Sequence, residues 1–166
     1  DSYSRTGYYV GGGLNFGFAD FDPADAYARD LDLGAGGPLW AGSRLHPTVA
    51  VDLLLQSLSA FDPDSLSGRG VGFGIFTAMG NVRAYPTSGR LQPFILIGLG
   101  SRLVDGTRPT DQSFFDAGFA ARFGGGFDLY TSETISFTFA SSYVLATGAA
   151  NKWNYVDLTL GLQYRF

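Results

Sequence analysis

The sequence contains no cysteine, a single histidine (His46) and few charged residues, which make up 16% of its 166 residues. Without cysteine, the chain can form no disulfide, no thiolate metal site and no cysteine nucleophile. Its formal net charge is −4 and its isoelectric point is about 4.7. Because nucleic-acid binding requires a basic surface, we expect no nucleic-acid partner.

Long hydrophobic runs are also missing. The most apolar stretch, residues 94–99, is far shorter than the roughly 18 apolar residues that a membrane-spanning helix requires. Aromatic residues make up 16% of the chain and glycines number 24, a composition that argues against disorder. The length suits one domain over residues 1–166. No signal peptide is visible, so in an exported protein Asp1 would lie at or after the cleavage point.

The most regular feature of the sequence is the alternation of apolar and polar residues, which is clearest in the last fourteen. One set of alternate positions is apolar: Val156, Leu158, Leu160, Leu162, Tyr164 and Phe166. Except for Tyr155, the other set is polar or small: Asp157, Thr159, Gly161, Gln163 and Arg165. Strict alternation predicts a β-strand with a different environment on each face. In a membrane strand the apolar face contacts lipid and the polar face points inward.

Similar alternation predicts eight strands in all. They cover residues 6–20, 33–45, 49–60, 70–85, 91–104, 113–130, 134–145 and 153–166. The connections between them alternate between longer and shorter. Proline cannot donate a ladder hydrogen bond, so Pro38 predicts a bulge or a local irregularity. The apolar positions change parity near Ile75 and Phe76, which predicts a β-bulge there.

Two stretches resemble known membrane barrels. The alternating strand that ends in Tyr164-Arg165-Phe166 resembles the C-terminal signature of bacterial outer-membrane β-barrels. The stretch Gln92-Pro93-Phe94, followed by Gly98 and Gly100, resembles a recurring segment of the small outer-membrane barrel families. Together with the eight strands, these features make the whole chain similar to the OmpA/OmpX-like superfamily.

The resemblance implies an all-β fold: an eight-stranded antiparallel up-and-down transmembrane β-barrel, monomeric, with four extracellular loops and both termini periplasmic. It implies the lipid bilayer and lipopolysaccharide as partners, together with a further envelope or surface protein. It also implies that the outer-membrane assembly machinery recognises Tyr164 and Phe166 during folding. A soluble lipocalin-like barrel is the architectural alternative, with a polar exterior and an apolar cavity. The apolar outer faces and the aromatic terminus favour the membrane barrel.

The alternation also predicts which charged side chains point into the barrel. A barrel of eight strands has an interior just wide enough for its own side chains. Buried charges must pair, so we expect a salt-bridged lumen with Arg122 as a hub that binds two carboxylates. A narrow ion path is the alternative, because inward glycines leave room for water. The predicted lumen charges are Arg44, Asp52, Arg83, Arg102, Asp116, Arg122, Asp128, Asp157 and Arg165.

His46 is the obvious candidate for a catalytic base. Ser43 is near it in sequence, but no acid accompanies the pair and the position is a predicted turn. A serine-histidine-acid site on this scaffold needs the base beside a serine nucleophile on a strand face. The amphipathic helix that begins lipid A palmitoyltransferase-like barrels is not readable here. We therefore expect no enzyme and no catalytic residues.

An acidic segment is the candidate for a metal site. Spaced carboxylates can hold calcium or magnesium, but this segment lacks the glycine and terminal glutamate of an EF-hand loop. A solvated loop is favoured, and no cofactor or metal is expected. The carboxylates are Asp20, Asp22, Asp25, Asp30 and Asp32.

The expected function is structural: anchoring in the outer membrane or interaction at the cell surface. The runner-up is a narrow pore or small-molecule transporter of the outer membrane. A lipid-modifying enzyme is third.

Overall fold

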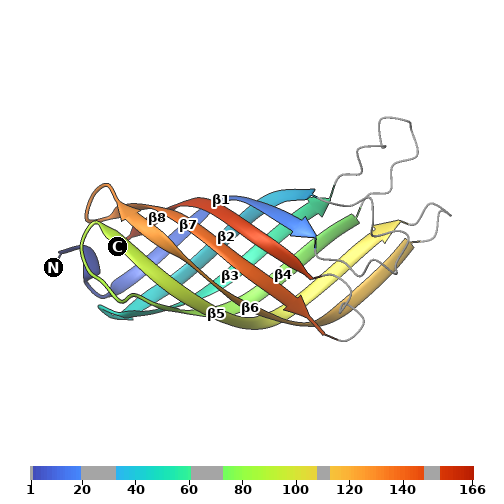
Figure 1. Cartoon of the computed structure of the whole chain (residues 1–166), viewed down its shortest axis with the longest axis horizontal. Coiled ribbons are helices and arrows are strands. Elements are labelled where there is room, and N and C mark those ends of the chain that lie inside the picture. Colours follow the sequence, from blue (N-terminus) through green and yellow to red (C-terminus); the bar gives the residue numbers. More distant parts are fainter. Residues whose placement is uncertain (1, 20–32, 61–72, 108–112, 148–153) are drawn as a thin grey trace.

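A computed structural model of the chain describes residues 2–19, 33–60, 73–107, 113–147 and 154–166 (Figure 1). These residues form one short 3₁₀ helix and eight strands in a closed barrel, in which each strand pairs antiparallel with its sequence neighbours and β1 pairs with β8. The predicted fold class is therefore confirmed. The elements are η1 (Ser2–Ser4), β1 (Gly7–Ala19), β2 (Leu33–His46), β3 (Val49–Ala60), β4 (Phe73–Ala84), β5 (Leu91–Thr107), β6 (Ser113–Tyr130), β7 (Ile135–Ala146) and β8 (Tyr155–Arg165).

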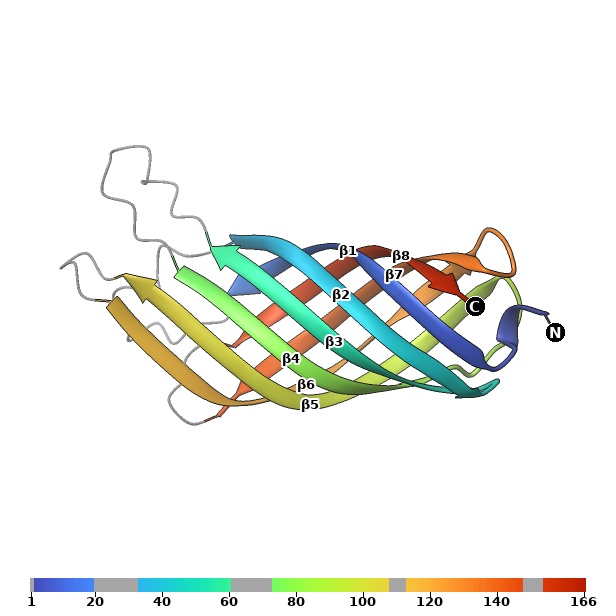
Figure 2. The same cartoon turned by 180° about the vertical axis from the view of Figure 1, so that it is seen from behind.

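The two ends of the barrel differ. At one end, here called the turn end, short connections join β2 to β3, β4 to β5 and β6 to β7, and η1 and the C-terminus lie beside them (Figures 1 and 2). The opposite end is called the loop end. Within the described residues, no helix has the length and apolar character needed to cross a membrane.

The strands are staggered as well as paired. A row of paired residues that starts at Tyr9 on β1 returns to the same strand at Ala19, ten residues farther along. Such a stagger tilts the strands around the axis and, with eight strands, leaves a narrow interior. The row runs through Tyr9, Gly42, Asp52, Asn81, Gly98, Arg122, Val144, Tyr155 and Ala19.

Apolar side chains cover the outside of this barrel. Phe119 is 76% exposed and Leu160 is 49% exposed, whereas the polar residues of the alternate positions are buried. This is the reverse of a soluble barrel, in which apolar side chains fill the interior. The predicted assignment of the two faces is correct, and the lipocalin-like alternative does not fit.

Strand ends differ slightly from the prediction. β5 continues to Thr107, three residues into the predicted loop, because it remains paired with β6 up to Ser113. β2 extends one residue to His46, and β8 begins at Tyr155. Trp153, the predicted first residue of the last strand, lies outside the described residues.

The β-bulge predicted at Ile75 and Phe76 is wrong. The register of β4 with both neighbouring strands runs through this point without a shift. Ile75 is 2% exposed and points into the lumen, where it is paired with Leu58 and Val104, and Phe76 points outward. The apolar parity changes because this part of the lumen is itself apolar.

Pro38 causes a smaller irregularity than a bulge. It pairs in register with Gln56 on β3. On its other side, the β1–β2 ladder passes from the Gly12–Leu39 pair to the Asn15–Gly36 pair with none between them. The register shift in β2 lies instead between Arg44 and His46.

Two adjacent glycines of β2 allow a direct test of this packing. A Cβ atom on Gly36 would overlap the carbonyl oxygen of Ser57, whereas one on Gly37 would meet nothing closer than 3.6 Å. We expect Gly36→Ala to lower the free energy of unfolding by about 1–3 kcal/mol, because the crowded backbone must shift. Gly37→Ala should be neutral or slightly stabilising. Urea unfolding in lipid vesicles measures both, and equal effects would contradict the register.

Candidate functional site

The barrel lumen is the candidate site, since the predicted polar residues gather there. Asp116 differs from the others: it lies on the inward row opposite Val104 but is partly exposed. The other predicted residues are all buried, with at most 6% exposure: Arg44, Asp52, Arg83, Arg102, Arg122, Asp128, Asp157 and Arg165.

The most connected group is the carboxylate of Asp157 on β8. Its Oδ1 accepts hydrogen bonds from Asn15 Nδ2 at 3.1 Å and from Gln56 Nε2 at 2.8 Å. Its Oδ2 accepts from Arg122 Nη2 and from Thr159 Oγ1, both at 2.9 Å. This cluster, called the Asp157 cluster, connects β1, β3, β6 and β8 across the lumen.

Arg122 is therefore not the hub that the sequence predicted. It binds one carboxylate, that of Asp157, and its Nε donates to Ser142 Oγ at 2.6 Å. Asp52 is bound elsewhere, and Asp116 takes part in neither ion pair of the described residues. The alternation placed these groups correctly on the inner face, but they lie at different positions along the barrel axis and so do not all meet.

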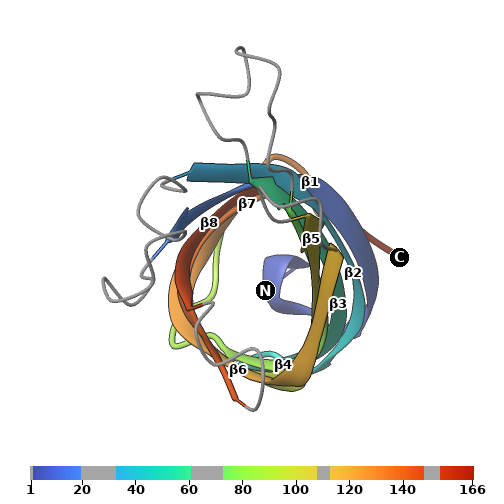
Figure 3. The same cartoon turned by 90° about the vertical axis from the view of Figure 1, so that its right-hand side faces the viewer.

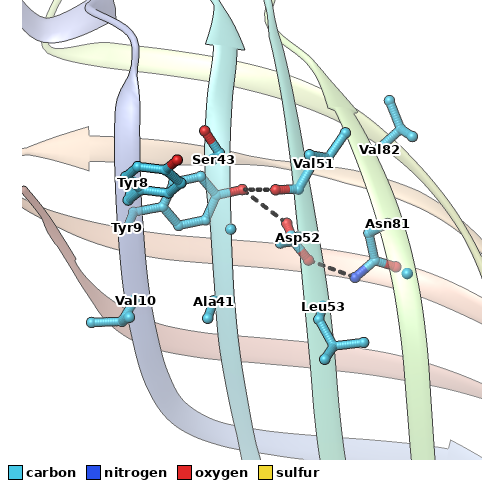
Figure 4. A pocket seen from close by; sticks show the side chains of 12 residues that line it. Tyr8, Tyr9, Val10, Ala41, Ser43, Val51, Asp52, Leu53, Asn81 and Val82 are labelled. Carbon is cyan, nitrogen blue, oxygen red and sulfur yellow. Dashed lines mark hydrogen bonds between the residues drawn. The ribbon is translucent and has the colours of Figure 1, made fainter.

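A second ion pair lies nearer the turn end. Arg83 Nε is 2.7 Å from Asp52 Oδ2, and its guanidinium lies 5.1 Å from the ring centroid of Phe94. Asp52 also accepts hydrogen bonds from Tyr9 OH at 3.1 Å and from Asn81 Nδ2 at 2.7 Å (Figure 4). Three strands and both charge signs thus meet around one carboxylate.

Asp128 has neutral donors instead of an ion pair. It accepts hydrogen bonds from Tyr85 OH at 2.8 Å and from Thr138 Oγ1 at 2.7 Å. Two arginines near the turn end bind oxygens that carry no full charge. Arg44 donates to Gln92 Oε1 at 2.5 Å and to the Pro47 carbonyl, and Arg165 donates to main-chain carbonyls. The filling is therefore only partly salt-bridged.

Trp40 fills the lumen between these groups. Its Nε1 donates to Gln163 Oε1 at 3.1 Å. A Cβ atom on either Gly11 or Gly161 would overlap the indole ring, so both inward glycines make room for it. The space that these glycines could have left for water is filled by an aromatic side chain.

Toward the loop end the lumen becomes apolar. Arg102 is fully buried there, with its guanidinium 4.8 Å from the ring centroid of Tyr155. The sequence analysis did not identify this apolar section. A usable signal was present, because Leu58 lies on the same face of β3 as Asp52 and Gln56 and must therefore also point inward. The buried members of this section include Leu58, Ile75 and Val104.

The outer surface of β1–β4 carries a hollow of about 740 Å³ (Figure 4). Its exposed members, such as Tyr8 and Leu53, belong to the outward-facing set. Small outward residues, including Ala41 and Gly80, line it together with larger ones. The hollow therefore lies on the apolar outer face, and Tyr9, Asp52 and Asn81 of the inward set complete its lining.

The predicted terminal aromatics lie on that outer face. Tyr164 and Phe166 are exposed, with ring centroids 5.2 Å apart in an edge-to-face arrangement. Phe166 N donates to the Tyr8 carbonyl at 3.0 Å, which ties the C-terminus to β1. Their role as an assembly signal stays a prediction.

No described residue forms a serine–histidine–acid arrangement with His46. It is exposed at the end of β2, and its Nδ1 lies 2.9 Å from Thr48 Oγ1, two residues away. Among the residues that the structure describes, no three histidine, aspartate or glutamate side chains are grouped to hold a metal ion. The acidic segment with Asp22 and Asp25 lies outside them.

The comparison with protein families decides the identity. The model of the family "Outer membrane protein beta-barrel domain" matches residues 1–166. The chain belongs to this family. It is thus an outer-membrane β-barrel, and its family indicates the bacterial outer membrane as its location. A search of curated proteins finds no match.

Solved structures share the fold at low sequence identity. Neisserial surface protein A has a TM-score of 0.74 at 11% identity, with 98% of this chain and 99% of that chain covered. Ail, the attachment invasion locus protein of Yersinia pestis, has a TM-score of 0.69 at 14% identity, with 98% of this chain and 99% of that chain covered. OprG from Pseudomonas aeruginosa has a TM-score of 0.67 at 15% identity, with 96% of each chain covered. The resemblance to small outer-membrane barrels is confirmed.

Proposed function

We propose that this barrel is a closed membrane anchor with a structural or surface-interaction role, and that it is neither a pore nor an enzyme. The Asp157 cluster is the observation that carries the proposal. Its hydrogen bonds join four strands across the lumen, so a permeating ion would have to displace Arg122 from its counter-charge. Breaking a buried ion pair is strongly unfavourable.

Two further sections support a closed lumen. Toward the turn end, Trp40 reaches across to Gln163 on β8. Toward the loop end, Leu58 reaches the inner surface of β1 and β2, because a Cβ atom on Gly17 would lie 2.5 Å from it and one on Gly34 would lie 3.0 Å from it. A water-filled path would have to pass both sections.

The proposed orientation has the turn end, with both termini, in the periplasm and the four loops outside. The lipid bilayer and lipopolysaccharide would surround the apolar outer face. The assembly machinery would bind the chain during folding, and a further envelope or surface protein would bind the loops. One of the similar structures is that of Ail in complex with a heparin analogue, sucrose octasulfate. That complex supports surface interaction as a class of function, without a ligand for this chain.

No enzymatic role is proposed. The single histidine is exposed and hydrogen-bonded to Thr48, and within the described part of the chain no serine–histidine–acid arrangement surrounds it. The buried polar side chains around Asp157 and Asp52 are hydrogen-bonded to each other.

We expect the purified protein to show no steady conductance in planar lipid bilayers, because the Asp157 cluster and the sections on either side of it close the lumen. Single-channel recording measures this directly. A matched control is Trp40→Ala in the same bilayer, which removes one closing side chain and leaves the Asp157 cluster. A steady ohmic current from the parent protein would contradict the closed barrel.

The narrow pore remains the second candidate because of one observation. Several buried polar atoms have no hydrogen-bond partner among the described residues, including Asn15 Oδ1, Thr77 Oγ1 and Ser136 Oγ. Buried polar atoms are normally hydrogen-bonded, and ordered water often supplies the bond. Water in the lumen would favour slow ion passage, and the conductance measurement separates the two functions.

A further inference from the structure

We propose that the segment Ser2–Arg5 is a removable stopper of the turn-end mouth, and that Arg165 is the latch that holds it. Seen along the barrel axis, η1 lies inside the ring of strands (Figure 3). Ser4 is 5% exposed, so its side chain is enclosed by the mouth. The proposal concerns access to the lumen and does not depend on the orientation of the barrel in the membrane.

Gly7 is the hinge between the stopper and the barrel. β1 begins at this residue, which pairs with Arg44 of β2, and the preceding residues leave the sheet. The φ angle of Gly7 is 151°, and a Cβ atom there would lie 3.1 Å from the Phe166 carbonyl oxygen. Glycine accepts such a conformation without steric cost, so the chain can fold back over the mouth.

The latch is a buried arginine that binds main-chain carbonyls. Arg165 is 1% exposed. Its Nη1 donates to the Tyr3 carbonyl at 2.7 Å, and its Nη2 donates to the Ser2 carbonyl at 3.0 Å and to the Glu133 carbonyl at 2.6 Å. One guanidinium therefore joins the stopper, the β6–β7 turn and β8.

Side chains of the mouth add further polar contacts to Tyr3. Gln92 Nε2 donates to its carbonyl at 3.0 Å, and Arg90 Nε donates to its hydroxyl at 3.1 Å. Its ring centroid lies 5.9 Å from that of Tyr130. None of these contacts is a strand pairing.

Hydrogen bonds of this kind can be exchanged for water, because every donor and acceptor would be solvated once the segment leaves. The stopper has one aromatic side chain, and that side chain is only partly buried. Its removal therefore exposes little apolar surface. The segment can open and close while the barrel remains folded. It would thereby control access of water and small solutes to the polar groups directly behind it at the turn end, such as Gln92 and Asp128, and not to the middle of the lumen.

Thiol labelling can test the stopper, since the chain contains no cysteine. The probe is Ser4→Cys, treated with a charged, membrane-impermeant thiol reagent in detergent micelles. Ser88→Cys, in the exposed β4–β5 turn, gives the rate for an open thiol. Ala140→Cys, 4% exposed in the middle of β7, reports the lumen. We expect Ser4→Cys to react much more slowly than Ser88→Cys.

Adding Arg165→Gln should raise the Ser4→Cys rate by about tenfold or more, because one hydrogen bond to a charged donor shifts an equilibrium by roughly that factor. Ala140→Cys should stay unreactive in the same background. Arg90→Gln removes a charge from the exposed rim and should raise the Ser4→Cys rate less than Arg165→Gln does.

Three results would each overturn the proposal. Equal rates for Ser4→Cys and Ser88→Cys in the otherwise unchanged protein would mean that the segment is not seated in the mouth. An unchanged rate with Arg165→Gln would mean that Arg165 is not the latch. If Arg165→Gln raised the labelling rates of both Ser4→Cys and Ala140→Cys, the whole barrel would have loosened.

Discussion

Replacing Asp157 by alanine is expected to lower the free energy of unfolding by about 3–5 kcal/mol. The variant would leave the charge of Arg122 buried without its counter-charge. It would also remove the acceptor of Asn15, Gln56 and Thr159. Urea unfolding in lipid vesicles, followed by the gel mobility of the folded barrel, measures the loss.

Asp116 provides the matched control for this change. Its carboxylate faces inward on β6 but is partly exposed and takes part in neither ion pair of the described residues. Asp116→Ala should change stability by no more than about 0.5 kcal/mol, as is usual away from buried networks. If both substitutions lower the free energy of unfolding equally little, water solvates the lumen charges and the proposal of a closed barrel is wrong.

A double-mutant cycle isolates the ion pair within the cluster. Arg122→Ala alone should cost a similar amount, about 3–5 kcal/mol, because it leaves Asp157 without its cation. The double variant should cost clearly less than the two single losses added together, since neither charge then stays behind. Additive losses would mean that the two side chains do not interact.

The second large effect is expected on the outer face. Leu160→Arg should destabilise the barrel by about 2–4 kcal/mol, because it places a charge against lipid near the middle of β8. Leu160 is 49% exposed and pairs with Leu14 on β1 and Phe139 on β7, both also outward. Unfolding in vesicles of defined thickness measures the change.

Position along the strand supplies the control. Tyr164→Arg lies on the same face near the end of β8, so it should cost no more than about 1 kcal/mol. Thr159→Arg should also destabilise, but through crowding of the lumen beside Asp157, and its cost should not depend on bilayer thickness. Equal costs for Leu160→Arg and Tyr164→Arg would contradict the predicted depth of these residues in the membrane.

The sequence alone was sufficient for the strands and their two faces. A strand repeats every two residues, so the residues on either side of Leu160 had to point away from lipid once Leu160 pointed toward it. The same rule correctly placed Asp52, Arg83 and Asp157 inside. It failed at Ile75, where the choice between a bulge and an apolar lumen depends on Leu58 and Val104 across the neighbouring strands.

Only the tertiary structure decided which inward groups meet. The alternation of a strand gives the direction of a side chain, whereas its height in the lumen depends on the stagger between strands, which shifts the row of pairs by ten residues around the barrel. That stagger brings Arg122 to Asp157 and places Asp52 beside Arg83 instead. The stopper was invisible in the sequence for a related reason. Residues Ser2–Arg5 show no periodicity, and their place is set by the long-range hydrogen bonds of Arg165, a residue at the other end of the chain.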